Sequence, residues 1–348
     1  MYLMKKKSMV LFATVLLLVM NTCAVKRTSI GSHDKILVVA DSTLWVDMKE
    51  VLSAVLERTT YTPQPEHIFN LMQKNPDELR RITRHPNLLI MGTLDSQGEM
   101  KDILDQLLSD ASVERIMKDE AFLFQKKNAW ALDQSLVVLA SKDAETLKKN
   151  IAEQSGKIFE VFDAFNEAFT HRTLFSRFEQ KEIEERLLAE HGWSVRVPHD
   201  YHVAVDSSDL RFVWLRRFDP QRMFAAYWEK VDDPSVLSKE WLLQKRAIFV
   251  DAFYDGDYVY QDSLITVREK VVDFNGRYAI RLDGVWQNDK HIMGGPFRTF
   301  GFYNEADRRI YILDLVVYAP GQRKYPFLRQ LDVMAHTFKT IADEKGGL

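Results

Sequence analysis

The sequence predicts a two-domain α+β protein, in which an N-terminal α/β sheet layer is joined by a long helix to an antiparallel sheet backed by helices. Two strand-turn-helix patterns follow one another at residues 36–57 and 88–108, which is typical of an α/β layer. Helical spacing then continues without Gly or Pro from Lys157 to His191, and strand patterns dominate the remainder. A chain of 348 residues with 46% hydrophobic side chains is long enough for about two hydrophobic cores.

The amino terminus has the pattern of a secretory signal. Three lysines at positions 5–7 precede the uncharged run Val10–Met20, which at 11 residues is too short to span a hydrocarbon layer of roughly 30 Å. Cys23 is the single cysteine, and it lies where a bacterial lipoprotein is acylated. The preceding residues resemble a lipobox, with Thr22 where Ala, Gly or Ser is usual. We expect a signal peptide at 1–22 and lipid attachment at Cys23; the alternative is a buried or incidental cysteine.

Cleavage before Cys23 would leave a tether at residues 23–34 and change the net charge from −3 to −6, because three lysines and no acid are removed. A mildly acidic chain lacks the usual electrostatic reason to bind nucleic acid. No later segment has the apolar length of a transmembrane helix. Surface-exported lipoproteins of some groups carry acidic residues after the cysteine, whereas this chain has Lys26 and Arg27. We therefore expect a lipid-anchored protein on the periplasmic face of the outer membrane.

The N-terminal α/β domain is expected at residues 35–142. Ile36–Ala40 is a continuous apolar run, typical of a strand covered on both faces, and a helix through Glu57 follows it. A second buried strand at Leu88–Met91 is again followed by a helix. Further strands are expected at 121–127, 129–132 and 135–140, where they extend the sheet with an antiparallel edge.

A long or gently kinked helix is expected at residues 143–191, and His191-Gly192 ends it. The second domain, residues 192–348, is expected to be an antiparallel sheet backed by helices. Its strongest signal is Asn275-Gly276 between two strand patterns, which predicts a hairpin. Strands are expected at 193–197, 201–205, 211–217, 223–228, 267–274, 278–286, 297–303 and 310–318, and helices at 238–254 and from Pro326 to Ile341.

Several blocks of the chain resemble one known family. They are Asp41-Ser42 with Leu44-Trp45, Pro198-His199-Asp200-Tyr201, Phe212-Val213-Trp214-Leu215, Gly284-Val285-Trp286, Met293-Gly294-Gly295-Pro296-Phe297, Tyr318-Ala319-Pro320 and Arg329-Gln330-Leu331-Asp332. With the signal, they make nearly the whole mature chain similar to Bacteroidota envelope lipoproteins that carry domain of unknown function 4837. That family has no established reaction, ligand or partner, so the resemblance implies a location and an architecture but no active site. The start of the second domain also resembles the photosystem extrinsic-protein and Mog1 type of sandwich, as a fold analogy.

Ser42 is the one candidate nucleophile. Asp41-Ser42 directly after a buried strand resembles the first block of SGNH esterases, in which a serine needs a histidine base and an orienting acid. Those enzymes carry Asp-x-x-His near the carboxy terminus, whereas Asp332 and His336 are one residue further apart, and Ala40 replaces the usual Gly. A helix-capping role for Ser42 is the alternative. We expect no catalytic residue and leave the esterase as a second hypothesis.

The nine histidines do not form a metal-binding pattern. His199 and His202 are close in sequence, but in an extended segment a spacing of three directs them to opposite faces, and no HExxH motif is present. We therefore expect no metal and no cofactor.

A candidate binding surface is predicted around Gly294 and Gly295. These glycines are compatible with a phosphate loop, but no Gly-Lys-Ser/Thr and no helix follow, so a bulge or bend between strands is favoured. The basic residues Arg298, Arg323, Lys324 and Arg329 would form a rim beside them, and an exposed Trp286 would add an aromatic platform; a solvated charged face and a core tryptophan are the alternatives.

Together these features predict a non-enzymatic envelope lipoprotein that binds a partner protein or an envelope ligand. The competing hypotheses are the esterase and a carrier of a hydrophobic ligand. The carrier requires an apolar cavity of several hundred Å³ between the sheet and the helices of the second domain, in the usual size range of ligand sites.

Overall fold

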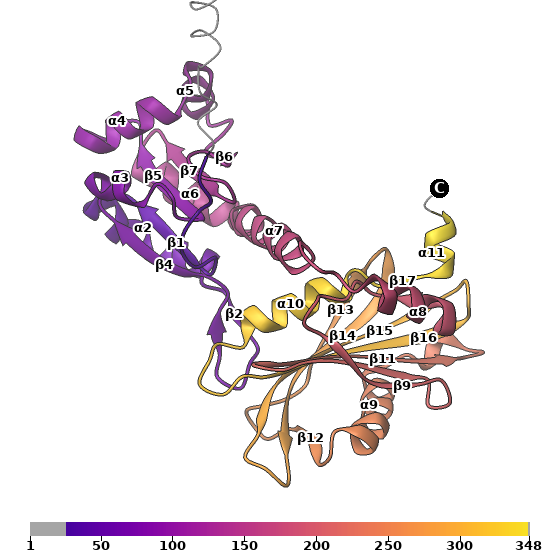
Figure 1. Ribbon diagram of the computed structural model, residues 1–348. Coiled ribbons are helices and arrows are strands. Elements are labelled where there is room, and N and C mark those ends of the chain that lie inside the picture. The colour runs from indigo at the N-terminus through magenta and orange to yellow at the C-terminus, as the bar shows by residue number, and fades with distance from the viewer. Residues whose placement is uncertain (1–25, 347–348) are drawn as a thin grey trace, which may run out of the picture. The chain divides into compact units, whose positions relative to one another are not determined.

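The computed structural model describes residues 26–346, so Cys23 and the signal lie outside the described residues, and it forms two compact units (Figure 1). The N-terminal unit comprises the chain up to residue 47 together with 72–147. The C-terminal unit comprises 48–71 together with the chain from residue 148 onward. Both units combine helices with a sheet, so the two-domain α+β class is confirmed.

The N-terminal unit is built on a five-stranded sheet in the order β4-β1-β5-β7-β6. The central strands β1 (Lys35–Val39), β5 (Asn87–Thr93) and β7 (Ser135–Ser141) are parallel. β6 (Leu123–Lys127) pairs antiparallel with β7, and β4 (Asn70–Lys74) forms the other edge. Every residue of β5 and β7 is buried, which explains the continuous apolar runs in the sequence. The predicted buried strands and the antiparallel edge are therefore confirmed.

Helices α4 (Gly98–Leu107) and α5 (Asp110–Met117) follow β5, and the short turns η1 (Pro76–Glu78) and α3 (Leu79–Ile82) precede it. α2 (Ser42–Leu56) begins in the N-terminal unit and continues into the other.

The strand predicted at 129–132 is wrong. The backbone N–H groups of Trp130 and Ala131 donate to Gln134 Oε1 at 2.9 and 3.3 Å, so a side chain takes the place of a neighbouring strand.

The single long helix predicted at 143–191 is also wrong, because this stretch forms three helices: α6 (Ala144–Glu153), α7 (Ser155–Leu174) and α8 (Lys181–His191). Between α7 and α8 the chain turns at Phe178, which has φ 54°. The Gln180 amide then donates to the carbonyl oxygens of Pro198 and Tyr201 at 2.7 and 2.5 Å. These contacts with a distant segment fix the turn. The helical spacing of apolar residues on either side of the turn does not predict them.

The C-terminal unit contains an eight-stranded antiparallel sheet in the order β12-β14-β15-β16-β11-β10-β9, with β13 also paired to β14. Its strands are β9 (His202–Ser207), β10 (Phe212–Arg217), β11 (Gln221–Lys230), β12 (Asp257–Tyr260), β13 (Arg268–Phe274), β14 (Arg277–Asn288), β15 (Gly294–Asn304) and β16 (Arg309–Tyr318). Asn275 and Gly276 join β13 to β14 with φ values of 52° and 77°, as a tight hairpin turn of the predicted kind requires.

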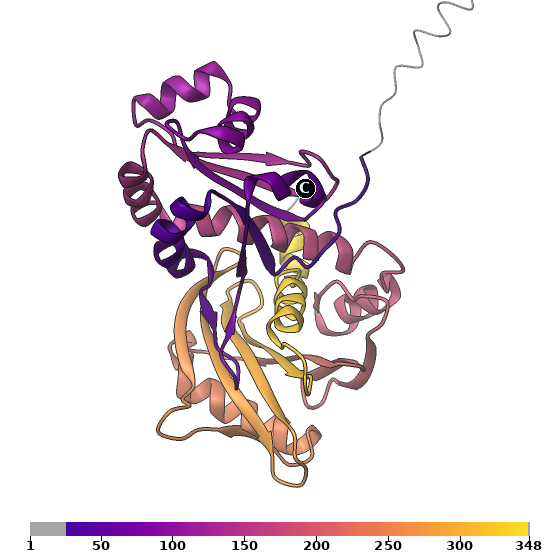
Figure 2. The same cartoon turned by 90° about the vertical axis from the view of Figure 1, so that its left-hand side faces the viewer.

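The two faces of this sheet are covered by different helices (Figures 1 and 2). α9 (Lys239–Phe253) packs on one face with Ile312 and Val316 of β16, whereas α10 (Tyr325–Ala335) packs on the other with Leu313 and Leu315. Alternate residues of one strand therefore enter separate cores, which is the period expected of a strand. Because both faces are covered, the central strands are apolar at nearly every position.

Short elements complete the C-terminal unit. β8 (Trp193–Ser194) pairs with β17 (Lys339–Thr340), so the strand predicted at 193–197 is only two residues long. The closing helix predicted from Pro326 to Ile341 ends at Ala335, and α11 (Ile341–Gly346) follows β17. The 3₁₀ turn η2 (Pro234–Val236) precedes α9, and β2 (Thr59–Thr60) pairs with β3 (Glu66–His67) as a hairpin. Among residues 26–346 none of the helices has both the length and the apolar composition needed to cross a bilayer.

Candidate ligand-binding site

The predicted binding surface is divided between two cavities. Trp286, Gly294, Gly295 and Lys324 line one of about 650 Å³, whereas Arg298 and Arg329 line another. Trp286 is buried, and its Nε1–H donates to the carbonyl oxygen of Val317 at 3.3 Å. Gly294 and Gly295 lie in regular register within β15, so the predicted bulge or bend is wrong. A Cβ on Gly295 would overlap the Val317 carbonyl oxygen, which explains a glycine at this position.

The predicted basic rim is dispersed as well. Arg298 is 5% exposed, so it is a buried residue rather than part of a rim. Arg323 and Lys324 precede α10, where the Lys324 N–H donates to Glu66 Oε1 at 2.8 Å. Arg298 and Arg329 nevertheless share one environment, because both line the same cavity.

This cavity, which we call the basic cavity, has a volume of about 320 Å³ and lies entirely within the C-terminal unit. Its walls are the β2–β3 hairpin, α7, the strands β13 to β15 and α10. Its basic lining residues are Arg58, Arg268, Lys270, Arg281, Arg298 and Arg329, and its acidic ones are Asp163, Glu167, Asp283 and Asp332. Six cationic side chains thus line it against four carboxylates.

Strand register places five of these charges on one face of the sheet. Lys270 of β13 lies directly opposite Arg281 of β14, while Asp283 lies opposite Arg268 on one side and Arg298 on the other. Residues two apart on a strand share a face, so the two cross-strand rows are adjacent. Two cations directly opposite each other destabilise an antiparallel pair, and here the Arg281 charge is compensated by Asp283 on the same strand, whereas Lys270 has no carboxylate partner among the residues described.

Asp283 is the anionic centre of the sheet wall. Its carboxylate accepts from Arg281 Nε at 2.8 Å and from Arg298 Nε at 2.7 Å. Burial opposes its ionisation, but the charges of Arg298 and Arg281 outweigh burial and hold the pKa of Asp283 below its ordinary value. Arg298 also reaches Asp332 of α10 at 2.9 Å, and despite burial these two carboxylates raise its pKa. Arg298 and Arg281 are therefore already neutralised.

Arg329 is neutralised on the helical side. It pairs with Asp163 of α7, and its Nε donates to Tyr325 Oη at 3.1 Å. This contact joins α10 to α7 and closes one wall of the basic cavity.

The remaining three cations have no carboxylate partner within ion-pairing distance among the residues described. The Arg268 guanidinium lies 4.0 Å from the ring centroid of Tyr61, and that of Arg58 lies 4.0 Å from the centroid of Phe159. Lys270 is exposed. Arg58 also donates to the carbonyl oxygens of Val55 and Ser155, at 3.0 and 3.4 Å. The basic cavity therefore carries positive charge that no carboxylate compensates, with Arg268 and Lys270 as its exposed donors.

The β2–β3 hairpin is held over these cations by three separate contacts. Glu66 accepts from the backbone N–H groups of Lys324 and Tyr325, at 2.8 and 3.0 Å, and so caps the amino terminus of α10. Tyr61 donates its hydroxyl to the carbonyl oxygen of Thr266 at 2.8 Å, and Arg323 donates to the carbonyl oxygen of His67.

The two alternative hypotheses require other geometry. Ser42 donates to Asn75 Oδ1 at 3.1 Å, and within residues 26–346 no imidazole is hydrogen-bonded to its hydroxyl, so it lacks the base that an esterase needs. His336 Nδ1 instead contacts the Asp332 carbonyl oxygen at 2.8 Å. The hydrophobic carrier requires an apolar lining, whereas charged residues line the basic cavity.

Sequence reasoning found Arg298 and Arg329 but missed Arg268, Lys270 and Arg281. The available signal was strand periodicity: 268 and 270, and 281 and 283, are charged pairs spaced two apart inside predicted strands. Their convergence depends on the pairing of β13 with β14, which the Asn275-Gly276 turn sets.

Three solved structures are similar to part of this chain. A protein from Bacteroides thetaiotaomicron VPI-5482 is 8% identical and covers 43% of this chain with a TM-score of 0.26, and the match spans 46% of that chain. LpqN, described as involved in cell envelope biogenesis of Mycobacterium tuberculosis, is 14% identical over 42% of this chain and 82% of its own, with a TM-score of 0.28. The Saccharomyces cerevisiae Ran-binding protein Mog1p is 10% identical over 43% of this chain and 90% of its own, with a TM-score of 0.30. Scores this low do not establish a shared fold, so the Mog1 analogy stays a prediction.

Two families match the sequence, and no curated protein does. Residues 180–337 match the family Domain of unknown function (DUF4837), and residues 29–175 match Domain of unknown function (DUF8532). The resemblance to DUF4837, expected over nearly the whole mature chain, therefore holds for residues 180–337, and the Asp41-Ser42 and Leu44-Trp45 blocks belong to the segment that matches DUF8532. The β2–β3 hairpin and α7 walls of the basic cavity belong to the DUF8532 segment. Its strands and α10 belong to the DUF4837 segment. The chain therefore carries a DUF4837 domain, preceded by a DUF8532 domain.

Proposed function

We propose that this protein is a lipid-anchored cell-envelope lipoprotein whose C-terminal unit binds a small anionic ligand in the basic cavity. The anchor rests on the sequence alone: a cationic start, a short apolar run and a single cysteine at the acylation position. More than one acyl chain would hold it stably, because each buried methylene contributes about 0.8 kcal/mol. The basic residues after Cys23 support the periplasmic face of the outer membrane, and the proposal includes an envelope protein as a further partner.

The observation that carries the ligand proposal is the charge imbalance of the basic cavity. Six cationic side chains line it against four carboxylates, and the three cations without a carboxylate partner are Arg58, Arg268 and Lys270. Charge-assisted hydrogen bonds from these side chains to a phosphate or carboxylate are shorter and stronger than neutral ones. An anion would also bridge the opposed Lys270 and Arg281.

The size of the cavity limits the ligand. A volume of about 320 Å³ is at the lower end of the range for small-molecule sites, so a phosphate- or carboxylate-bearing molecule fits better than a polymer. The net charge of −3 is also unlike that of a nucleic-acid-binding protein.

Thermal unfolding in the presence of anions tests this proposal. Inorganic phosphate and citrate should each raise the melting temperature of the mature chain more than chloride at equal ionic strength. Arg268→Ala and Lys270→Ala should weaken phosphate binding at least tenfold by calorimetry. Lys230→Ala is the matched control, since Lys230 is an exposed lysine at the end of β11.

Two outcomes would contradict the ligand proposal: neither anion stabilises the protein more than chloride, or Lys230→Ala weakens binding as much as the cavity variants. The anchor has its own test, in which cells are labelled with a clickable fatty acid. The wild type should acquire the label and fractionate with the outer membrane, and Cys23→Ala should do neither.

A further inference from the structure

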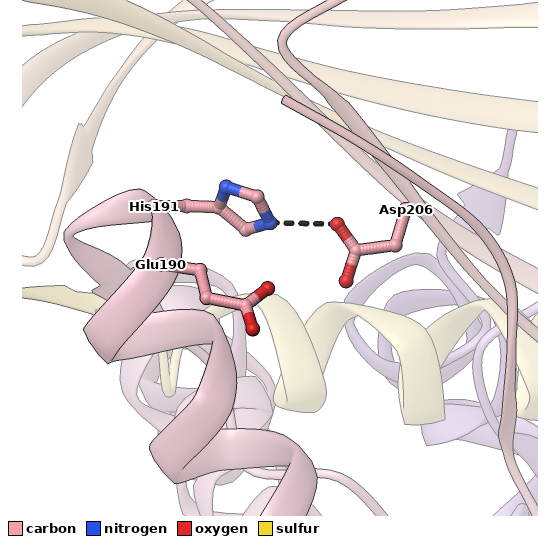
Figure 3. A group of neighbouring side chains, drawn as sticks. All are labelled: Glu190, His191 and Asp206. Atoms are coloured by element: carbon pink, nitrogen blue, oxygen red, sulfur yellow. Dashed lines mark hydrogen bonds and ion pairs between the residues drawn. The ribbon is translucent and has the colours of Figure 1, made fainter. Parts of the chain in front are cut away.

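A second cluster of chemically reactive side chains lies at the carboxyl end of α8, apart from the basic cavity. His191 Nε2 lies 2.7 Å from Asp206 Oδ1 of β9, and Glu190 precedes His191 on the helix. One ligand atom from each residue lies within 4.8 Å of the others. Figure 3 shows the Glu190 and Asp206 carboxylates on the same side of the ring as Nε2.

The imidazole is fixed in place before any ligand arrives. The His191 side chain is 1% exposed, and its ring packs against Trp228 at 4.8 Å between centroids and against Trp193 at 6.2 Å. Glu190 and Asp206, in contrast, are exposed. A rigid nitrogen donor thus faces two adaptable oxygen donors at the surface, which leaves an entry path and room for a water.

The surroundings of the cluster favour a cation. α8 ends at His191, and Gly192 at φ 81° forms its left-handed cap, so the negative end of the helix dipole lies at the cluster. One cationic side chain already lies beside the cluster, since Arg186 Nη2 is 3.6 Å from Asp206 Oδ2.

We propose that Glu190, His191 and Asp206 bind a zinc ion, with water in the fourth position. One imidazole with two carboxylates is a donor set that zinc accepts, whereas calcium and magnesium prefer oxygen ligands alone. Two ligands about 2.0–2.1 Å from a tetrahedral zinc lie about 3.3 Å apart, so the His191–Asp206 contact has to open slightly and Glu190 has to move inward. His191 gives up its hydrogen bond to Asp206 and binds through the Nε2 lone pair, with its proton on Nδ1.

Calorimetric titration of the chelator-treated mature chain with Zn²⁺ tests the site. One equivalent should bind, and Asp206→Asn and Glu190→Gln should each weaken binding at least tenfold. Glu190→Gln should do so while leaving the melting temperature in chelator unchanged. His202→Ala should have no effect on zinc binding, because His202 is the first residue of β9 and its ring stacks on Phe218, not on the cluster. Arg186→Gln should tighten binding severalfold, since it removes a competing cation.

Loss of affinity in the two carboxamide variants with no loss in His202→Ala supports the site. Absence of one-equivalent binding, or unchanged affinity in Asp206→Asn and Glu190→Gln, overturns it. Neither result depends on whether the basic cavity binds an anion.

Discussion

Glu66 caps a helix that begins 259 residues further along the chain: its Oε2 accepts the backbone N–H of Tyr325 at 3.0 Å. The first N–H groups of an α-helix lack partners inside the helix, and the positive end of the helix dipole favours a carboxylate there. This contact fixes the β2–β3 hairpin beside α10, so one acidic residue shapes a wall of the basic cavity.

Replacing Glu66 should therefore loosen the hairpin. Glu66→Ala is expected to lower the free energy of unfolding by about 1–2 kcal/mol, because two backbone N–H groups lose their acceptor. Urea denaturation of the mature chain measures this change. Glu305→Ala, at an exposed turn position, should differ from the wild type by less than about 0.5 kcal/mol, and an equal loss in both variants would contradict the capping role.

Lys270 is expected to lower the stability of the unliganded protein and to strengthen phosphate binding. Lys270→Gln is expected to stabilise the unliganded protein by about 0.2–1 kcal/mol, because it removes a cation directly opposite Arg281. The same variant should bind phosphate more weakly. Lys126→Gln, at an exposed lysine of β6 that lies opposite Leu136, should change neither the unfolding free energy nor phosphate affinity, and a destabilised Lys270→Gln would show that no charge repulsion exists in the cavity.

Arg298 should be the most sensitive cavity residue. Arg298→Met leaves Asp332 Oδ2 without its cation and Asp283 with Arg281 alone, and removal of one partner of a buried pair costs about 3–5 kcal/mol. Its matched control is Arg308→Met, because Arg308 pairs with Asp232 at the surface, where such pairs contribute about 0–1 kcal/mol. Chemical denaturation separates the two, and similar losses would mean that the cavity network adds no stability.

Glu179 gives a pH signature. A hydrogen bond from Arg196 outweighs partial burial and lowers the pKa of Glu179 from 4.5 to about 2. Because its folded-state pKa is depressed, its contribution is fully present above pH 4.5 and is lost as the pH falls towards 2. Glu179→Gln should cost about 2 kcal/mol at pH 7 and flatten the stability profile between pH 5 and roughly 2. Glu182→Gln, exposed on α8, should keep the wild-type slope.

Local patterns predicted those parts of the fold that local chemistry decides. The Asn275-Gly276 turn accepts positive φ at both positions, and the apolar run at 88–91 has no alternative to burial, so both were identified correctly. The break between α7 and α8 was not, because Gln180 fixes it by binding carbonyl groups around residue 200. The spacing of apolar residues in the sequence does not predict contacts of this kind.

The two proposed binding sites likewise depend on contacts between distant segments, which local sequence patterns do not predict. Arg298 was identified as a charged residue near the correct strands, but its burial depends on Asp283 and Asp332, which come from another strand and from a helix. Asp206 joins His191 only because β9 passes the end of α8. A histidine beside a glutamate gives no metal pattern in the sequence, so the third donor had to come from the tertiary structure.

The division of the cavity walls between two sequence families has a consequence for inheritance. A descendant that kept only the segment matching DUF4837 would retain the strands and α10 but lose Arg58, Tyr61 and Asp163. It would lose the Tyr61 ring that lies beside Arg268 and the carboxylate that pairs with Arg329. The proposed ligand site therefore needs both modules in one chain, and a gene that separates them should lose part of its lining.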